Sequence, residues 1–153
     1  MRLLVVHHTS SPALEAMLDA VVAGANDDLI EGVEVLARPA LTAAVVDVLE
    51  ADGYVLGTPA NLGYISGALK HFFDQIYYPC REATHGRPFG LYVHGNNDTT
   101  GAERAVETIT KGMGWRQAHD HVRIIGTPGR PDLDACRDLG ATLAAGLTMD
   151  APP

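Results

Sequence analysis

Two kinds of hydrophobic pattern alternate along the chain. Short apolar runs are typical of strands buried on both faces, and longer segments carry apolar residues every three or four positions, as amphipathic helices do. The short runs predict five strands: Leu3–Val6, Val33–Ala37, Gly53–Gly57, Phe89–Val93 and one within Trp115–Ile125. The longer segments predict five helices: Pro12–Ala23, Leu41–Leu49, Ile65–Ile76, Ala102–Gly112 and Asp132–Leu147. This alternation predicts an α/β fold in which a parallel sheet carries helices on both faces.

The bulk properties favour one globular domain and argue against two classes of partner. We expect residues 1–150 to form a single domain and residues 151–153 a frayed tail. The net charge of -8 would repel nucleic acid and anionic membranes. Cys80 and Cys136 lack metal or redox spacing, which predicts free thiols in a reducing compartment. The apolar run at the N-terminus is too short for a signal peptide or a membrane span, so we expect a cytoplasmic protein without membrane insertion.

A family pattern follows the third predicted strand. It reads Thr58-Pro59, then Gly63, then Leu69-Lys70, Phe72 and Asp74. This pattern resembles the second flavin-binding loop of the flavodoxin-like superfamily, and within it the NAD(P)H-dependent FMN reductases and quinone reductases. The resemblance implies a flavodoxin-like three-layer sandwich with a five-stranded parallel sheet in the order 2-1-3-4-5. In that order, the loops after strands 1, 3 and 4 meet at one edge of the sheet.

The first of these loops leaves a strand and begins a helix, so free N–H groups and the positive end of the helix dipole point outward together. It has three hydroxyl residues in a row and neither Lys nor Arg, and a phosphate fits such a site. Compared with the flavodoxin phosphate loop, Thr-x-Thr-Gly-x-Thr, the chain has Ser11 in place of Gly and Ala13 in place of the last Thr. The alternative is that Ser11 merely caps the helix. The residues expected at the phosphate are His8, Thr9, Ser10, Ser11, Ala13 and Leu14.

The second and third loops offer groups for a planar heterocycle. Asn61 and the backbone amides suit its hydrogen-bonding edge, and Leu62 or Tyr64 can pack against its face. The alternatives are a plain connecting loop, in which Gly63 only permits positive φ, and a routine turn after the fourth strand. From the second loop we expect contacts from Thr58, Pro59, Ala60, Asn61, Leu62 and Gly63. From the third loop we expect contacts from His94, Gly95 and Asn96.

Histidines elsewhere have simpler interpretations. His94 either donates a proton to the flavin or its substrate or serves as a structural hydrogen-bonding group. His119 and His121 would share one face of a strand, but no third ligand has a matching spacing, so we predict surface residues and no metal site. Trp115 is predicted to be structural.

The resemblance implies an FMN-binding flavoprotein that takes a hydride from NAD(P)H and passes electrons to free flavin or a quinone. No catalytic residue is assigned, because the redox chemistry belongs to the flavin. Two alternatives stay open, a flavodoxin-type electron carrier without its own substrate and a cofactor-less binding module. A receiver-type phosphoacceptor domain is disfavoured, because the positions that need acidic residues hold His7-His8-Thr9 and Gly57-Thr58-Pro59. Tyr77-Tyr78-Pro79 predicts a homodimer interface, since exposed clustered aromatic residues often mark interfaces.

Overall fold

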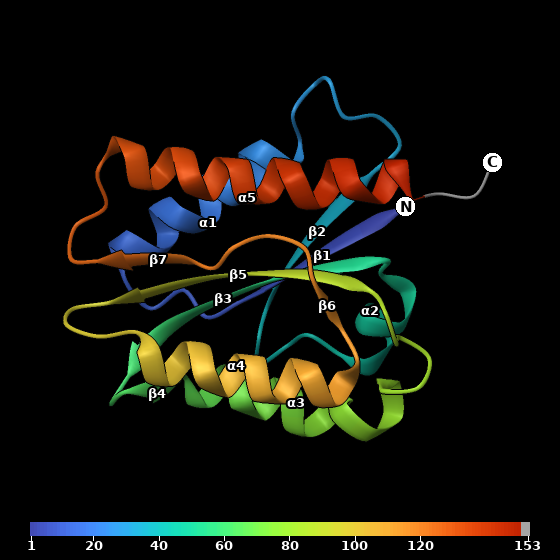
Figure 1. The fold of residues 1–153 in the computed structure, drawn as a ribbon, viewed down its shortest axis with the longest axis horizontal. Helices are drawn as coiled ribbons and strands as arrows, with labels where there is room; N and C mark the ends of the chain where they lie inside the picture. Colours follow the sequence, from blue (N-terminus) through green and yellow to red (C-terminus); the bar gives the residue numbers. More distant parts are fainter. Residues whose placement is uncertain (151–153) are drawn as a thin grey trace.

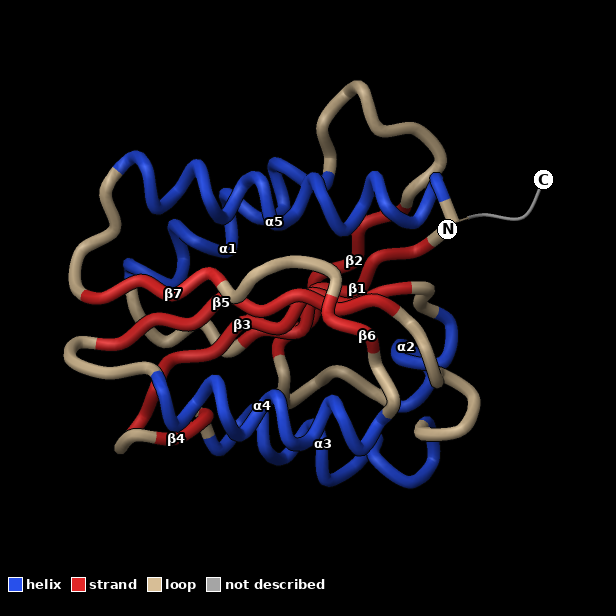
Figure 2. Tube along the Cα trace, in the orientation of Figure 1, coloured by secondary structure: helices blue, strands red, loops and turns tan. Residues whose placement is uncertain are grey.

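The computed structural model describes residues 1–150 and shows a parallel sheet between two layers of helices (Figures 1 and 2). The main strands lie in the order β2-β1-β3-β5, and the short strands β6 and β7 both pair with the outer edge of β5. This confirms the predicted order 2-1-3-4-5, with the fifth position shared by two short strands. The bounds of the parallel strands are β1 Arg2–His7, β2 Glu34–Pro39, β3 Gly53–Asn61, β5 Pro88–Gly95, β6 Arg116–Gln117 and β7 Val122–Ile125.

Each face of the sheet is covered by its own helices. Helices α1 and α5 cover one face, and α2, α3 and α4 lie on the other, which is the lower side in Figure 1. Because side chains alternate along a strand, Leu3 and Val5 belong to the core under α1 and α5, whereas Leu4 and Val6 belong to the opposite core. The helices run over α1 Pro12–Ala25, α2 Val45–Glu50, α3 Gly67–Cys80, α4 Thr100–Met113 and α5 Arg130–Met149.

The loop predicted over residues 58–64 is instead largely a β-hairpin, so that prediction was wrong. β3 continues to Asn61 and pairs antiparallel with β4, Tyr64–Ile65. Leu62 and Gly63 between them have φ values of 51° and 74°. Two consecutive residues with positive φ are the signature of a type I′ turn, whose twist matches that of the flanking strands. Helix α3 therefore begins two residues later than predicted, with Ser66 as its cap.

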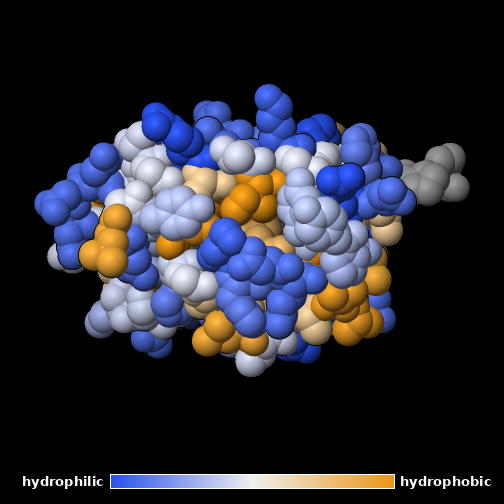
Figure 3. Space-filling model, turned by 90° about the horizontal axis from the view of Figure 1, so that it is seen from below, coloured by the Kyte–Doolittle hydropathy of each residue, from blue (hydrophilic) through white to orange (hydrophobic). Residues whose placement is uncertain are grey.

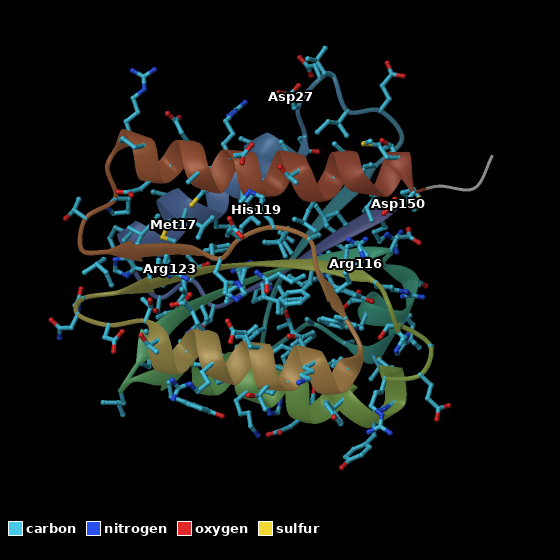
Figure 4. The ribbon with its side chains drawn as sticks, in the orientation of Figure 1. Met17, Asp27, Arg116, His119, Arg123 and Asp150 are labelled. Carbon is cyan, nitrogen blue, oxygen red and sulfur yellow. The ribbon has the colours of Figure 1, made fainter. Side chains whose placement is uncertain are left out.

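The segment predicted to hold one fifth strand is interrupted between β6 and β7. His119 and His121 lie in this interruption and do not share a strand face. The His119 Nε2 atom lies 3.1 Å from a carboxylate oxygen of Asp138 on α5, and His121 Nε2 lies 3.0 Å from one of Glu107 on α4. The two rings therefore bond to helices on opposite faces of the sheet (His119 is labelled in Figure 4).

Close packing of α1 on α5 moves one predicted helix end. The helix predicted to end at Ala23 instead includes Gly24 and Ala25, and Asn26 is the cap. A Cβ atom at Gly24 would overlap the carbonyl oxygen of Arg137, and one at Gly140 would overlap that of Val21. These glycines therefore let the two helix backbones approach each other closely.

Trp115 is structural, as predicted. Its ring stacks on Tyr54 with centroids 4.0 Å apart, and its Nε1–H donates to Thr84 Oγ1 at 2.9 Å. Thr84 lies between the third predicted helix and the fourth predicted strand. Helix α3 continues beyond its predicted end at Ile76, through Pro79 to Cys80, and Thr84 is fully buried.

Candidate functional site

Strand register brings the three predicted loops together at the carboxyl edge of the sheet. His7 pairs with Gly57, and Pro59 pairs with His94. The His8 N–H donates to the Gly57 carbonyl at 3.0 Å, which joins the first loop to β3. This edge lies at the left of Figure 1, where the arrows of β5 and β7 end. Ligands of open α/β sheets bind at this kind of edge.

The first loop combines a helix cap with unused donors. Ser11 Oγ accepts a hydrogen bond from the Leu14 N–H at 3.2 Å, so the capping interpretation is confirmed. The side chain of Leu14 is buried in the core. Within residues 1–150, however, the N–H groups of Thr9, Ser10 and Ala13 have no protein acceptor. A cap and a set of free donors therefore occur in the same loop, and the two interpretations do not exclude each other.

Two histidine rings flank these donors. His7 Nδ1 lies 2.7 Å from Thr9 Oγ1, which engages that hydroxyl. Burial, and secondarily the neighbouring His8, lower the pKa of His7, so its ring is neutral at pH 7. His8 Nδ1 is buried and has no partner among the described residues. A buried polar atom without a partner is costly, and this one lies in the loop that was predicted to bind phosphate.

A depression of about 440 Å³ extends from the first loop to the end of β5. It is lined by the predicted residues Ser11, Ala13, His94 and Asn96 together with Pro12, Ala16, Gly126, Thr127 and Pro128. The turn that follows β7 was missed in the sequence analysis. It also leaves the carboxyl end of a strand, so the rule that located the other three loops would have found it.

His94 connects this turn to β5. Its Nε2 atom lies 2.7 Å from the carbonyl oxygen of Gly126. With the carbonyl as acceptor, Nε2 carries the proton, which leaves Nδ1 as the free ring nitrogen. The bond supports the structural interpretation of His94, since the ring is held across the depression.

The hairpin after β3 stands beside this depression and does not line it. Thr58 is fully buried: its Oγ1 accepts a hydrogen bond from the Ser66 N–H at 3.1 Å and donates to the Pro59 carbonyl at 2.8 Å. Asn61, Leu62 and Gly63 are exposed at the tip. The structure therefore separates the second loop into a buried, internally bonded base and an exposed tip.

The hairpin tip rests on the start of α4, and the third loop is ordered by its own bonds. A Cβ atom at Gly101 would overlap the carbonyl oxygen of Gly63, so hairpin and helix are in direct contact. Asp98 accepts hydrogen bonds from the hydroxyl group and the backbone N–H of Thr100, and these bonds lower its pKa. The end of the third loop, from Asp98 to Gly101, is therefore tied to the start of α4 beside the hairpin.

Neither a metal-binding cluster nor a membrane-spanning helix is found in the described part of the chain. In residues 1–150, no three His, Cys, Asp or Glu side chains form a group that could hold a metal ion. Over the same residues, no helix has the length and apolar character needed to span a bilayer.

The fold and its converging loops define a flavodoxin-like flavoprotein of the FMN-binding type, and the comparisons agree. Residues 33–126 match the family model described as NADPH-dependent FMN reductase. That match spans more than half of the chain, so the chain belongs to this family. A flavodoxin of Aquifex aeolicus is 36% identical over 75 residues, which is 49% of this chain and 40% of the relative. The chain therefore matches less than half of that relative's length.

Solved structures share the fold at low sequence identity. A flavodoxin from the domain Archaea has a TM-score of 0.83 and 19% identity, with 97% of this chain and 99% of that chain covered. A flavodoxin, WrbA-like protein from Agrobacterium tumefaciens has a TM-score of 0.79 and 19% identity, with 98% and 99% covered. At this level of identity, the similarity shows the fold alone.

Proposed function

We propose that the protein binds FMN at the carboxyl edge of its sheet and transfers electrons from NAD(P)H to a small-molecule acceptor, either free flavin or a quinone. One observation carries the proposal: free N–H donors and a buried, unpartnered His8 Nδ1 occur in the loop that family members use for phosphate. The family membership supports the same cofactor.

The FMN phosphate would be held without a cationic side chain. The N–H groups of Thr9, Ser10 and Ala13 would donate to its oxygens, and the exposed Ser10 hydroxyl would add a further donor. The positive end of the α1 dipole favours the same negative charge. In the neutral tautomer that carries its proton on Nδ1, His8 would donate that N–H to a phosphate oxygen, so the buried nitrogen would gain a partner.

The flavin ring would lie next to the hairpin tip and the third loop. Asn61 and Asn96 supply amide groups for its polar edge, and Leu62 supplies an apolar surface for one face. When bound, FMN supplies hydride acceptance and electron transfer, and the protein supplies binding and orientation. The third loop, residues 94–101, contains no Phe, Tyr or Trp. No large ring therefore covers the flavin from that side, and a nicotinamide or quinone would have access to it.

A carboxylate placed in the phosphate loop tests the proposal. Ser10→Asp puts a negative charge beside the phosphate, and Ser10→Asn is the neutral control of the same shape. We expect Ser10→Asp to weaken FMN binding at least about 100-fold, and riboflavin binding far less, because riboflavin lacks the phosphate. Titration followed by flavin absorbance and fluorescence gives both affinities. A wild-type protein that does not bind FMN, or equal losses for both flavins, would show that the site assignment is wrong.

The reductase and the electron carrier differ in their reaction with pyridine nucleotide. The Aquifex relative is named a flavodoxin, so the carrier deserves a direct test. We expect anaerobic NADPH or NADH alone to bleach the FMN-loaded protein, and added free FMN or quinone to restore the oxidised spectrum. Slow or absent bleaching, in a protein that dithionite does reduce, would favour the carrier.

We also propose a homodimer, which rests on exposed apolar side chains. Tyr78 on α3 is 79% exposed, and Val46 on the neighbouring helix α2 is 55% exposed. Figure 3 shows apolar surface between polar side chains on the face that carries α3 and α4. Light scattering at micromolar concentration tests the state, and Tyr78→Asp is expected to shift a dimer toward monomer. A monomeric wild type would refute the proposal.

A further inference from the structure

Arg104 on α4 separates two depressions near the hairpin. The first, of about 460 Å³, lies between α4 and β7 and includes Arg123 and Ile125. The second, of about 360 Å³, is a mainly apolar trough that is lined by Tyr64, Gly101, Ala105, Thr108 and Ile109, with Arg104 at its border. Arg104 lines both depressions and is exposed.

The guanidinium of Arg104 has no acceptor within residues 1–150, although three carboxylates are nearby. Glu103 accepts from Thr99 Oγ1 at 2.9 Å and from Arg123, whose Nη2 lies 2.6 Å away. Glu107 is bonded to His121, and Asp98 accepts the two hydrogen bonds from Thr100. Each carboxylate is thus committed to another partner. Arg123, which bonds to Glu103 on α4, is labelled on β7 in Figure 4.

Arg104 is also close to the proposed flavin position. Gly101 contacts the hairpin tip at Gly63, and Arg104 follows it by three residues. Residues three apart lie on the same side of a helix, about 5 Å along its axis. An anion bound by Arg104 therefore lies within about one helical turn of the hairpin, beside a trough that has room for a planar ring.

We propose that Arg104 binds a phosphate group of the pyridine nucleotide, and that the Tyr64 trough takes its adenine ring. The inference rests on the proposed function, because it assumes that the reductant reaches a flavin at the hairpin. An exposed arginine is suited to phosphate, since its planar donors pair with two oxygens at once. The net charge of -8 repels a polyanion over much of the surface, so an unpaired cation beside the trough favours nucleotide binding there.

Nucleotide binding is tested by calorimetric titration of NADP⁺ into FMN-loaded and FMN-free protein. Arg104→Gln removes the charge, and Lys111→Gln, on the same helix but in its last turn, is the matched control. We expect Arg104→Gln to weaken NADP⁺ binding about tenfold or more, Lys111→Gln to leave it within about twofold, and Arg104→Lys to restore part of it. Tyr64→Ala should weaken binding, whereas Tyr64→Phe should not, because stacking needs the ring and not the hydroxyl.

The outcomes separate this inference from the proposed function. In the reductase assay, the Arg104→Gln variant should have a raised KM for NADPH, with FMN affinity and dithionite reduction unchanged. If NADP⁺ binding is equal in wild type, Arg104→Gln and Lys111→Gln, or absent in all three, the Arg104 assignment is wrong even where FMN is bound and reduced. If FMN does not bind, the proposed function fails. NADP⁺ binding that still depends on Arg104 in FMN-free protein would then support a nucleotide site by itself.

Discussion

Substitutions of Leu62 can separate two effects of this residue: the backbone strain in the hairpin turn and the proposed contact of its side chain with the flavin. Its φ of 51° lies in the left-handed region, and its side chain is fully exposed, so it gains no packing in return. A non-glycine residue pays roughly 1–2 kcal/mol for this conformation, whereas Asn accepts it more readily through local hydrogen bonds. Asn followed by Gly is also the preferred pair for a type I′ turn. Leu62→Asn should therefore stabilise the FMN-free protein by about 1 kcal/mol.

The same substitution should weaken FMN binding. If the Leu62 side chain covers one face of the flavin, about half of its burial free energy of roughly 1.5–3 kcal/mol is realised on binding. Its loss predicts an affinity about 4- to 13-fold lower. We therefore expect the melting temperature of the FMN-free protein to rise by about 2–4 °C while FMN binding weakens.

Leu62→Ala is the control, because it removes the side chain but keeps a Cβ atom at positive φ. It should weaken FMN binding equally without raising the melting temperature. Thermal unfolding of FMN-free protein and a fluorescence titration measure the two effects. A Leu62→Asn protein that melts at or below the wild-type temperature would refute the strain argument, and unchanged FMN affinity in both variants would refute the contact.

Three further predictions concern the rest of the molecule. Tyr92→Phe removes a buried hydroxyl that has no partner in residues 1–150, so urea unfolding should show no loss of stability and a gain of up to about 1 kcal/mol. The folded-state pKa of His7 is lowered, so the unfolded chain binds the proton more tightly and the free energy of unfolding should fall as the pH drops below about 6.5. Melting temperatures measured from pH 7.5 to 5 should show this slope, and His7→Gln should flatten it. Gly24→Ala forces a methyl group onto the Arg137 carbonyl and should cost about 1–3 kcal/mol in urea unfolding, whereas Ala23→Ser at the adjacent exposed position should change little.

The three predicted loops lie at one edge of the sheet, as expected, and a fourth turn joins them there. Three loops were located because each follows a buried strand, and the parallel register then brings them to one edge. The turn at Gly126 was missed, although His94, 32 residues earlier, is bonded to it. The type I′ turn was also missed, because a Leu at the first turn position gives no sign of positive φ. Both features depend on backbone geometry and on partners that are distant in the chain.

The sequence by itself determined the alternation of strands and helices, the faces they bury and the positions of the three loops that leave the carboxyl ends of strands. These follow from interactions between residues at most four positions apart, so a local pattern carries them. Only the tertiary structure decided which donors stay free: the N–H groups of the first loop, His8 Nδ1 and Arg104. Whether a polar group is free or hydrogen-bonded depends on what packs beside it. Near Arg104, the carboxylates of Glu103 and Glu107 are hydrogen-bonded to Arg123 and His121, which come from a different part of the chain. The set of free donors is therefore a property of the packed edge and not of any single loop.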